Sequence, residues 1–168
     1  AIATQQTGFW FVGQARGNYP DVIGGILWFG TDDAATSYVT PIYSNTEKVP
    51  ECFRQGNGNL LSYSATSSFW INNRISNACY RMYNIMAPYV RERIDKFENE
   101  QMEKVRQNDV KALELFKKSM DSAEKVGKKK SLAYDVMTDT GASFAAVKRL
   151  LTSYSVKTAQ DIFKQWQE

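Results

Sequence analysis

Residues 24–30 read GGILWFG, a continuous apolar run bounded by glycines. Such a run is typical of a β-strand that is buried on both faces. Strand character also occurs on either side of it, in residues 7–14 (TGFWFVGQ) and in residues 37–43 (SYVTPIY). Pro41 in the later stretch indicates an edge strand or a bulge. We therefore expect the first part of the chain to form a β-sheet.

The segments around these strands have the composition of turns and loops. Residues 16–21 (RGNYPD) form a turn cluster, and residues 31–35 (TDDAA) form a tight polar connection. Residues 49–61 (VPECFRQGNGNLL) form a longer loop, which leads towards the helices.

The spacing of apolar side chains predicts helices from residue 67 onward. The first helix is expected over residues 67–86, with Ser67 or Ser68 as its cap. Its expected buried face consists of Ile71, Ile75, Ala78, Met82 and Ile85. Because proline is favoured at the first position of a helix, Pro88 is expected to begin the second. That helix would bury a narrow stripe made of Val90, Ile94 and Phe97.

Three further helices are expected after that. Asp109 is expected to begin the third, whose inward side chains would be Val110, Leu113, Phe116 and Met120. The last two are expected over residues 142–154 and 155–167, with Ser155 as the cap of the final one. Residues 125–130 (KVGKKK) are expected to form a solvated turn. The predicted fold class is therefore α+β, with strands and loops over residues 1–66 and mainly helices over residues 67–168.

Composition excludes several classes of function. The chain has 168 residues, of which 43% are hydrophobic, so it can bury the core of one domain. No apolar run is long enough to cross a bilayer. The net charge of +3 is too weak to indicate nucleic acid as a partner, and the basic run at 128–130 lacks interleaved aromatic residues.

The chain contains no histidine and only two cysteines. Within this chain, that rules out a nucleophile activated by histidine, as well as the commonest metal ligand. Two cysteines are too few for a zinc ribbon, and no metal or cofactor is expected. Cys52 and Cys79 are expected to be separate buried thiols, although the sequence leaves their pairing open.

Polar residues that could carry chemistry gather at two places. Asp32 and Asp33 follow the apolar run, and neighbouring carboxylates on a strand point to opposite faces, which argues against an acid–base pair. At a turn, both could instead accept hydrogen bonds from backbone N–H groups. Asn72, Asn73 and Arg74 lie near the start of the first helix, where solvation, capping or stacking of the guanidinium on a ring would also explain them.

Four stretches resemble one known family. They are residues 2–11 (IATQQTGFWF), 24–40 (GGILWFGTDDAATSYVT), 49–58 (VPECFRQGNG) and 67–77 (SSFWINNRISN), and they are similar to the PepD-type dipeptidases. These enzymes are N-terminal-nucleophile cysteine hydrolases, related to choloylglycine hydrolase and penicillin V acylase. The resemblance implies a four-layer αββα sandwich and hydrolysis of dipeptides.

The resemblance also implies a nucleophile that this chain lacks. In such enzymes the nucleophile is a cysteine at the mature N-terminus, and its own α-amino group, with a pKa of roughly 8, serves as the base. Residue 1 here is alanine. We therefore expect the chain to be the C-terminal portion of a dipeptidase domain, inactive by itself, whose missing N-terminal region completes the enzyme. Cys52 is not expected to be the nucleophile.

The resemblance further suggests partners for the two ends of a dipeptide. Asp32 and Asp33 would bind its ammonium group, although fixing the loop is an equally good role for them. Arg74 would bind its carboxylate, and Asn72 or Asn73 would donate a hydrogen bond to the developing oxyanion.

Two other functions and several properties stay open. The alternatives are a non-catalytic binding or assembly domain with the same fold, and a hydrolase of bile-salt-like or penicillin-like amides. The expected cut through the sandwich would leave apolar surface uncovered, so the isolated chain should self-associate or rearrange its early aromatic segment. The compartment, whether cytoplasmic or exported, is left open.

Overall fold

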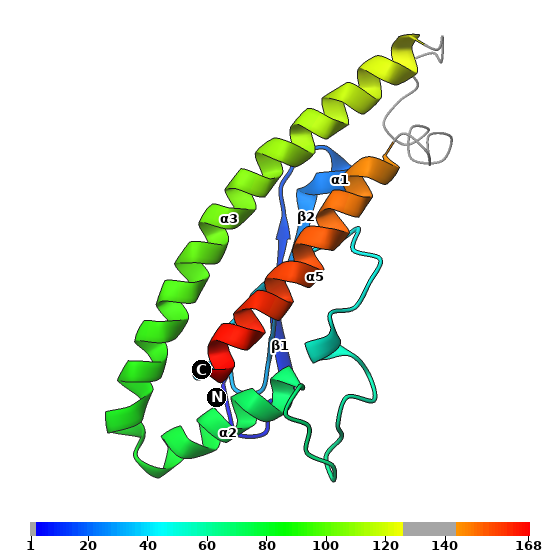
Figure 1. Cartoon of the computed structure of the whole chain (residues 1–168). Helices are drawn as coiled ribbons and strands as arrows, with labels where there is room; N and C mark the ends of the chain where they lie inside the picture. Colours follow the sequence, from blue (N-terminus) through cyan, green and yellow to red (C-terminus); the bar gives the residue numbers. More distant parts are fainter. Residues whose placement is uncertain (1–2, 126–143) are drawn as a thin grey trace.

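A three-stranded antiparallel sheet forms the first part of the protein. The computed structural model describes residues 3–125 and 144–168. Its strands are β1 (Phe9–Ala15), β2 (Gly25–Thr31) and β3 (Thr40–Tyr43), in the spatial order β1-β2-β3 (Figure 1). All three expected strands are present, and Pro41 lies on an edge strand as its lack of a backbone N–H requires.

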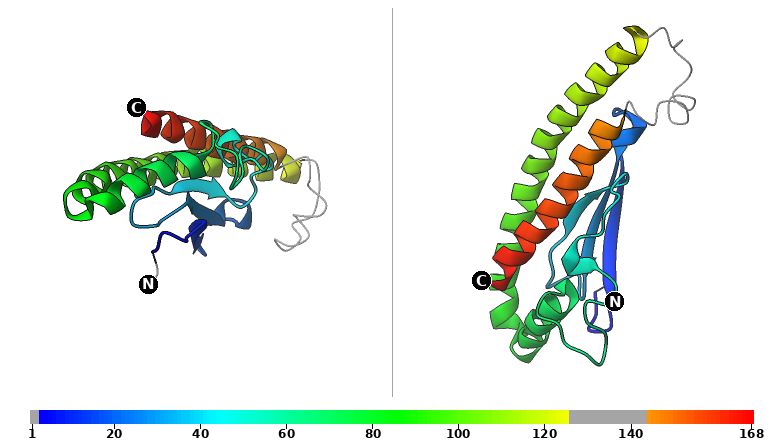
Figure 2. Two further views of the ribbon diagram at one scale, coloured as in Figure 1. Left: turned by 90° about the horizontal axis from the view of Figure 1, so that it is seen from below. Right: turned by 45° about the vertical axis from the view of Figure 1, so that its right-hand side comes forward.

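Helices make up most of the remainder. The short α1 (Asp21–Gly24) and η1 (Glu51–Phe53) flank the sheet, and α2 (Ser68–Arg81) lies across one end of it. Two long helices, α3 (Tyr83–Lys125) and α5 (Ala145–Gln167), run antiparallel and cover one face of the sheet (Figures 1 and 2). The predicted α+β class is confirmed. In the described part of the chain, no helix combines the length and the apolar character that crossing a membrane requires.

Helix boundaries differ from the expected ones, beginning with the first two helices. The first helix ends at Arg81, and Ser67 occupies its N-cap position without a capping hydrogen bond from its side chain. Pro88 lies inside α3 and does not begin it. Pro88 is the sixth residue of α3, so its lack of an N–H leaves the Asn84 carbonyl without the bond that the helix would otherwise make there.

The third expected helix is also a continuation of α3, which runs through Asp109 without a break. Asp109 does not act as a cap because its carboxylate accepts hydrogen bonds from other side chains, and Val110 is exposed instead of inward. At 43 residues, α3 is about 65 Å long.

The last two expected helices form one continuous helix, α5. Ser155 is buried in its middle, where its hydroxyl accepts hydrogen bonds from the Tyr43 backbone N–H at 3.1 Å and from the Thr46 hydroxyl at 3.0 Å. The serine therefore joins α5 to the end of β3 and does not cap a helix. Lys125, expected to begin the turn at 125–130, is the last residue of α3. The rest of that turn, and the start of the helix expected at 142, lie outside the described residues.

The long helices and the sheet enclose two apolar clusters. The first is formed by side chains of α1, the sheet, α3 and the N-terminal half of α5. The second is formed by side chains of α2, η1, α3 and the C-terminal half of α5, together with Tyr38. The buried members of the first are Val22, Ile23, Ile26, Tyr43, Val105, Ala112, Phe144, Val147 and Leu151. Those of the second are Tyr38, Cys52, Ile71, Ile94, Phe97, Ala159, Ile162, Phe163 and Trp166.

A buried ion pair ties the end of β1 to α3. The guanidinium of Arg16 donates two hydrogen bonds to the carboxylate of Asp109, which also accepts one from the Tyr43 hydroxyl at 2.7 Å. Arg16 further donates to the Ile23 carbonyl at 2.7 Å. Because each of these polar groups has a hydrogen-bond partner, the pair can fix the position of the sheet edge relative to α3.

Close contact between β1 and β2 depends on a glycine. A Cβ on Gly30 would lie 2.6 Å from the indole nitrogen of Trp10 and 2.9 Å from the Tyr38 carbonyl oxygen. The same indole nitrogen donates to the Ser37 hydroxyl at 2.8 Å. Gly30 therefore leaves the room that the Trp10 ring needs to reach Ser37 in the loop after β2.

The expectation that β2 is buried on both faces is wrong. Ile26 and Trp28 face the helices, whereas Leu27 and Phe29 point to the opposite face and are only half-buried. Residues directly opposite each other share a face, so Phe11 lies beside Phe29 and Ile42 beside Leu27. Neither α3 nor α5 covers this side of the sheet (Figure 2).

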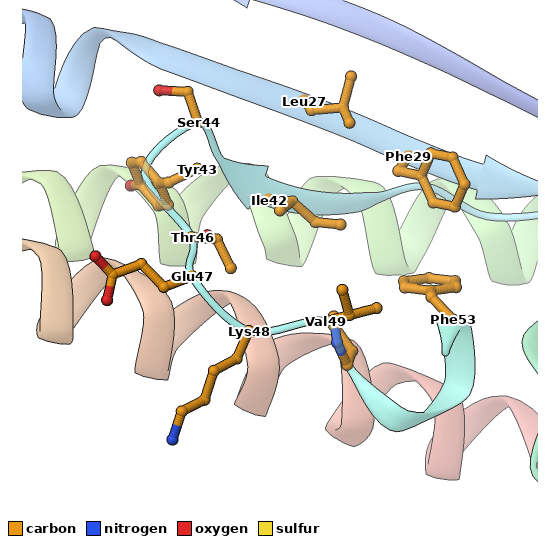
Figure 3. Close-up of a pocket in the computed structure, with 11 residues that line it drawn as sticks. Leu27, Phe29, Ile42, Tyr43, Ser44, Thr46, Glu47, Lys48, Val49 and Phe53 are labelled. Carbon is orange, nitrogen blue, oxygen red and sulfur yellow. The ribbon is translucent and has the colours of Figure 1, made fainter. Parts of the chain in front are cut away.

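The uncovered face is apolar. We call the set Phe9, Phe11, Leu27, Phe29 and Ile42 the outer sheet face. Phe9 and Phe11 are 62% and 58% exposed. The segment after β3 covers only one edge of this face. There the ring centroids of Phe53 and Phe29 lie 5.2 Å apart, and a pocket of about 420 Å³ remains beside them (Figure 3).

We predict that the outer sheet face drives self-association of the 168-residue chain. Burying one phenylalanine contributes about 1.5–3 kcal/mol, so Phe11→Lys should raise the dissociation constant about tenfold or more. Leu61→Lys, in a loop where the side chain is 97% exposed, is the matched control and should change nothing. Analytical ultracentrifugation over a wide concentration range measures this. A clean monomer of the unsubstituted chain at every concentration contradicts the prediction.

Candidate functional site

Asp32 and Asp33 lie in the turn that leaves β2, and both are buried. Asp32 has φ = 69°, in the left-handed region that aspartate tolerates better than most residues. Its backbone N–H donates to the Gly8 carbonyl at 3.0 Å. This left-handed residue ends the strand and lets both carboxylates reach α2, whereas side chains on a straight strand would diverge.

The carboxylate of Asp32 is held by two neutral donors on α2. The Ser76 hydroxyl donates to Oδ2 at 2.5 Å, and the Asn73 amide donates to Oδ1 at 3.1 Å. Thr36, from the same loop as Asp32, places its hydroxyl 2.7 Å from that of Ser76. The loop and the helix are thus joined by a chain of hydrogen bonds.

Asp33 has one partner in its own loop and one on α2. Its Oδ1 accepts the Ala35 backbone N–H at 2.9 Å, the kind of contact expected for an aspartate in a turn. Its Oδ2 accepts a hydrogen bond from the Tyr80 hydroxyl. Burial, and then the nearby Asp33 carboxylate, raise the pKa of Tyr80 well above its usual value, so its hydroxyl stays protonated and remains a donor.

The two carboxylates share one electrostatic property. Among the described residues, neither forms an ion pair with a lysine or an arginine. Their four oxygens accept hydrogen bonds from neutral groups only. Two buried carboxylates without a counter-charge favour the approach of a cation.

Asn72 is fully buried beside this cluster, contrary to the solvated or capping roles that its position suggested. Its side-chain nitrogen donates to the Thr31 hydroxyl at 3.0 Å and to the Thr31 carbonyl at 3.2 Å. The amide oxygen has no hydrogen-bond partner among the described residues. In this orientation Asn72 offers an acceptor, while Asn73, with a single donated bond to Asp32, keeps an amide hydrogen for another acceptor.

Arg74 lies apart from the other four candidate residues. It is exposed on α2 and donates one hydrogen bond, at 3.2 Å, to the Tyr63 hydroxyl. The structure therefore brings together Asp32, Asp33, Asn72 and Asn73 but not Arg74.

The buried face of α2 is only partly the expected apolar one. Ile71 is buried and Ile75 packs against the second apolar cluster, as expected. Ala78 on α2, and Met82 and Ile85 beyond its end, are exposed, and polar residues take their place inside. Three members of this hydrogen-bonded cluster were not predicted: Ser76 and Tyr80, which donate to the carboxylates, and Thr36, which bonds to Ser76. A signal for two of them exists, because residues 72, 76 and 80 recur every four positions and therefore share one side of a helix.

Comparison with known proteins places the whole cluster inside a family match. A family model described as Peptidase family C69 matches residues 1–96, which include the sheet, the loop and α2. A comparison with curated proteins found no match. The chain belongs to Peptidase family C69, so the predicted membership of the PepD-type dipeptidase family is confirmed.

Neither cysteine is an activated nucleophile. Cys52 packs in the second apolar cluster, and burial, reinforced by the charge of Glu51, raises the pKa of its thiol to about 12. Cys79 is fully buried, and burial followed by the charge of Asp33 raises its thiol pKa as well. Both are free thiols, as expected. A thiolate is the reactive form, so burial and a raised pKa both disfavour reaction at these two sulfurs near neutral pH.

We predict that iodoacetamide at pH 8 does not modify the folded chain. With a pKa of about 12, only about one Cys52 thiol in ten thousand is ionised at that pH. Unfolding in urea returns both thiols to ordinary pKa values, and both should then react within minutes. Mass spectrometry of timed samples measures the difference. Rapid labelling of either cysteine in the folded protein would show that its sulfur is accessible and ionised.

We predict that Asp32→Ala destabilises the fold by about 2–3 kcal/mol. It removes the acceptor of the Ser76 and Asn73 bonds and keeps a Cβ in the left-handed conformation without the hydrogen-bonded carboxylate that offsets its cost. Asp32→Gly loses the same bonds but relieves the backbone, so it should be more stable than Asp32→Ala by about 1 kcal/mol. Urea unfolding followed by circular dichroism measures both. Equal stability of the two variants would argue against backbone strain at Asp32. Unchanged stability in both would argue against a stabilising role for the hydrogen bonds of Asp32 to Ser76 and Asn73.

Proposed function

We propose that this chain is the scaffold and substrate-holding portion of a cysteine dipeptidase of the N-terminal-nucleophile class. The attacking thiolate would come from outside the 168 residues. One observation carries the proposal: a chain that belongs to a peptidase family has no histidine, and both of its thiols are buried with raised pKa values. The chemistry that the family performs therefore needs a nucleophile from another segment.

The proposed reaction needs no side-chain base. The α-amino group of an N-terminal cysteine takes the thiol proton, and the thiolate attacks the peptide carbonyl to form a tetrahedral oxyanion. Collapse breaks the C–N bond, and the proton passes to the leaving amine. Water then hydrolyses the thioester and releases the N-terminal residue of the dipeptide as a free amino acid. The uncommitted amide hydrogen of Asn73 is our candidate donor to the oxyanion.

Asp32 and Asp33 are our candidates for binding the ammonium group of the dipeptide. Each carboxylate oxygen accepts one bond in the structure and has a lone pair left for another. Among the described residues, no lysine or arginine forms an ion pair with either carboxylate, which supports this role. Arg74, although it lies on the exposed side of α2 apart from this cluster, is our candidate for the carboxylate end, because its guanidinium makes a single described hydrogen bond and keeps donors for a two-pronged contact.

The same proposal accounts for the outer sheet face. In an αββα sandwich, a second sheet packs on the side of the first that its helices leave open. Phe9, Phe11 and Phe29 give this side the apolar character that such packing requires. Residues 1–168 would then be the C-terminal portion of a single dipeptidase domain.

A non-catalytic binding or assembly domain is the second candidate. One observation favours it: all four carboxylate oxygens of Asp32 and Asp33 already accept hydrogen bonds inside the protein. In that case the cluster only anchors α2 to the sheet, and the family fold would be kept without its chemistry.

The decisive experiment uses the complete parent polypeptide. We expect it to hydrolyse simple dipeptides, to lose this activity when its N-terminal cysteine is replaced by alanine, and to be inhibited by iodoacetamide. The 168-residue chain alone should show no turnover. A parent that lacks iodoacetamide-sensitive peptidase activity, or one whose mature chain begins with another residue, favours the binding domain. Faster cleavage of bile-salt-like or penicillin-like amides than of dipeptides would identify an acyl-amide hydrolase instead.

In the active parent, Asp33→Asn should raise KM for dipeptides with a free ammonium group about tenfold, because it removes one charged partner. Dipeptides with an acetylated N-terminus should not be affected by the substitution. Asp121→Asn, an exposed carboxylate on α3, is the matched control. An equal effect on free and acetylated substrates would show that Asp33 acts only on the fold.

A further inference from the structure

A second, smaller pocket lies on the seam between α3 and α5, away from the aspartate cluster. Its volume is about 250 Å³, and all of its lining residues come from these two helices. Pockets for drug-sized ligands usually exceed about 300 Å³, so this one suits a small metabolite.

The pocket contains polar groups that the fold leaves unsatisfied. Gln101 lines it while being only 2% exposed, and its side-chain carbonyl oxygen has no hydrogen-bond partner among the described residues. The hydroxyl of Tyr154, another lining residue, is buried and forms no well-directed hydrogen bond among the described residues, with the Thr158 side chain as its polar neighbour. Each such group costs about 1–3 kcal/mol, which a bound molecule with matching groups would recover.

Charges of both signs surround these groups. Lys104 and Lys157 line the pocket together with Asp161, and none of the three forms an ion pair among the described residues. A simple anion would use the lysines but would face the carbonyl oxygen of Gln101 and the carboxylate of Asp161, which repel it. A simple cation would face the two lysines. A molecule that carries both charges meets neither conflict.

We propose that this pocket binds a small zwitterion of the free α-amino acid class. The Gln101 carbonyl and Asp161 would accept the ammonium hydrogens. The Tyr154 hydroxyl would donate to the carboxylate, which Lys104 and Lys157 neutralise. Burial raises the pKa of Tyr154 to about 12, so its hydroxyl is present as the donor at neutral pH. The proposal stands on this pocket and does not depend on peptidase activity.

Isothermal titration calorimetry on the 168-residue chain tests the proposal. Glycine and L-alanine are the probes, acetate lacks the ammonium group, and methylamine lacks the carboxylate. We expect saturable binding of the amino acids that is at least about tenfold tighter than binding of either half-molecule. No saturable heat would mean that water alone fills the pocket. Equal binding of acetate and glycine would mean a simple anion site, and either result overturns the proposal.

Substitutions separate the site from the fold. Gln101→Leu keeps the volume but removes the acceptor, so it should weaken amino-acid binding about tenfold while raising Tm, because an unsatisfied buried group is lost. Asp161→Asn should weaken binding about two- to fivefold, since the charge it removes is exposed. Lys164→Ala, an exposed lysine of α5 that does not line the pocket, is the matched control. Unchanged binding in Gln101→Leu with a native circular dichroism spectrum contradicts the proposal.

Discussion

Two carboxylates buried at the end of β2 have to be hydrogen-bonded, and α2 supplies most of the donors. The requirement links the local backbone to the global arrangement, because the left-handed conformation of Asp32 aims its carboxylate at Ser76 and Asn73. It also sets where α2 must lie, across the end of the sheet and within reach of Tyr80. The candidate site is therefore a consequence of how the strand ends. Whatever binds there meets groups that the fold has already oriented.

The molecule has one covered and one open side, and the two sides differ in chemistry. On the covered side, the Arg16–Asp109 pair and Ser155 join the sheet to α3 and α5 through satisfied polar contacts. On the open side, the outer sheet face presents aromatic rings without polar partners. Paired polar contacts on the covered side fix the relative positions of the sheet and the helices. The apolar open side gains stability in proportion to the area that another apolar layer buries on it. This contrast underlies our proposal that the chain is one portion of a larger sandwich.

Short-range patterns predicted the strands well. The glycine-bounded apolar run became β2, and Pro41 was correctly expected at an edge, since both follow from local backbone chemistry. Helix ends were harder to predict. Pro88 and Asp109 have strong preferences for helix starts, but α3 passes through both, because packing against the sheet and the pair with Arg16 outweigh those preferences. The supposed boundary before Ser155 failed for the same reason, since its hydroxyl serves β3.

The site was only partly predictable. Asp32, Asp33 and the two asparagines stand out in the sequence by residue type, and the family resemblance gave them roles. Ser76 and Thr36 do not stand out, because a hydroxyl gains its importance from a tertiary contact that spans more than 40 residues for Ser76 and Asp32. Arg74 illustrates the converse case: it adjoins Asn73 in sequence, but the helix turns it to the exposed side, where it meets Tyr63.

The raised pKa values of Cys52 and Cys79 also have a practical consequence for spectroscopy. A cysteine introduced at an exposed position, such as Leu61, would be the reactive sulfur of the folded chain. A spin label or a fluorophore could therefore be attached there while both native thiols are kept. Pairs of such labels, one on the loop and one near the C-terminus of α5, would report how far this loop lies from α5 in solution.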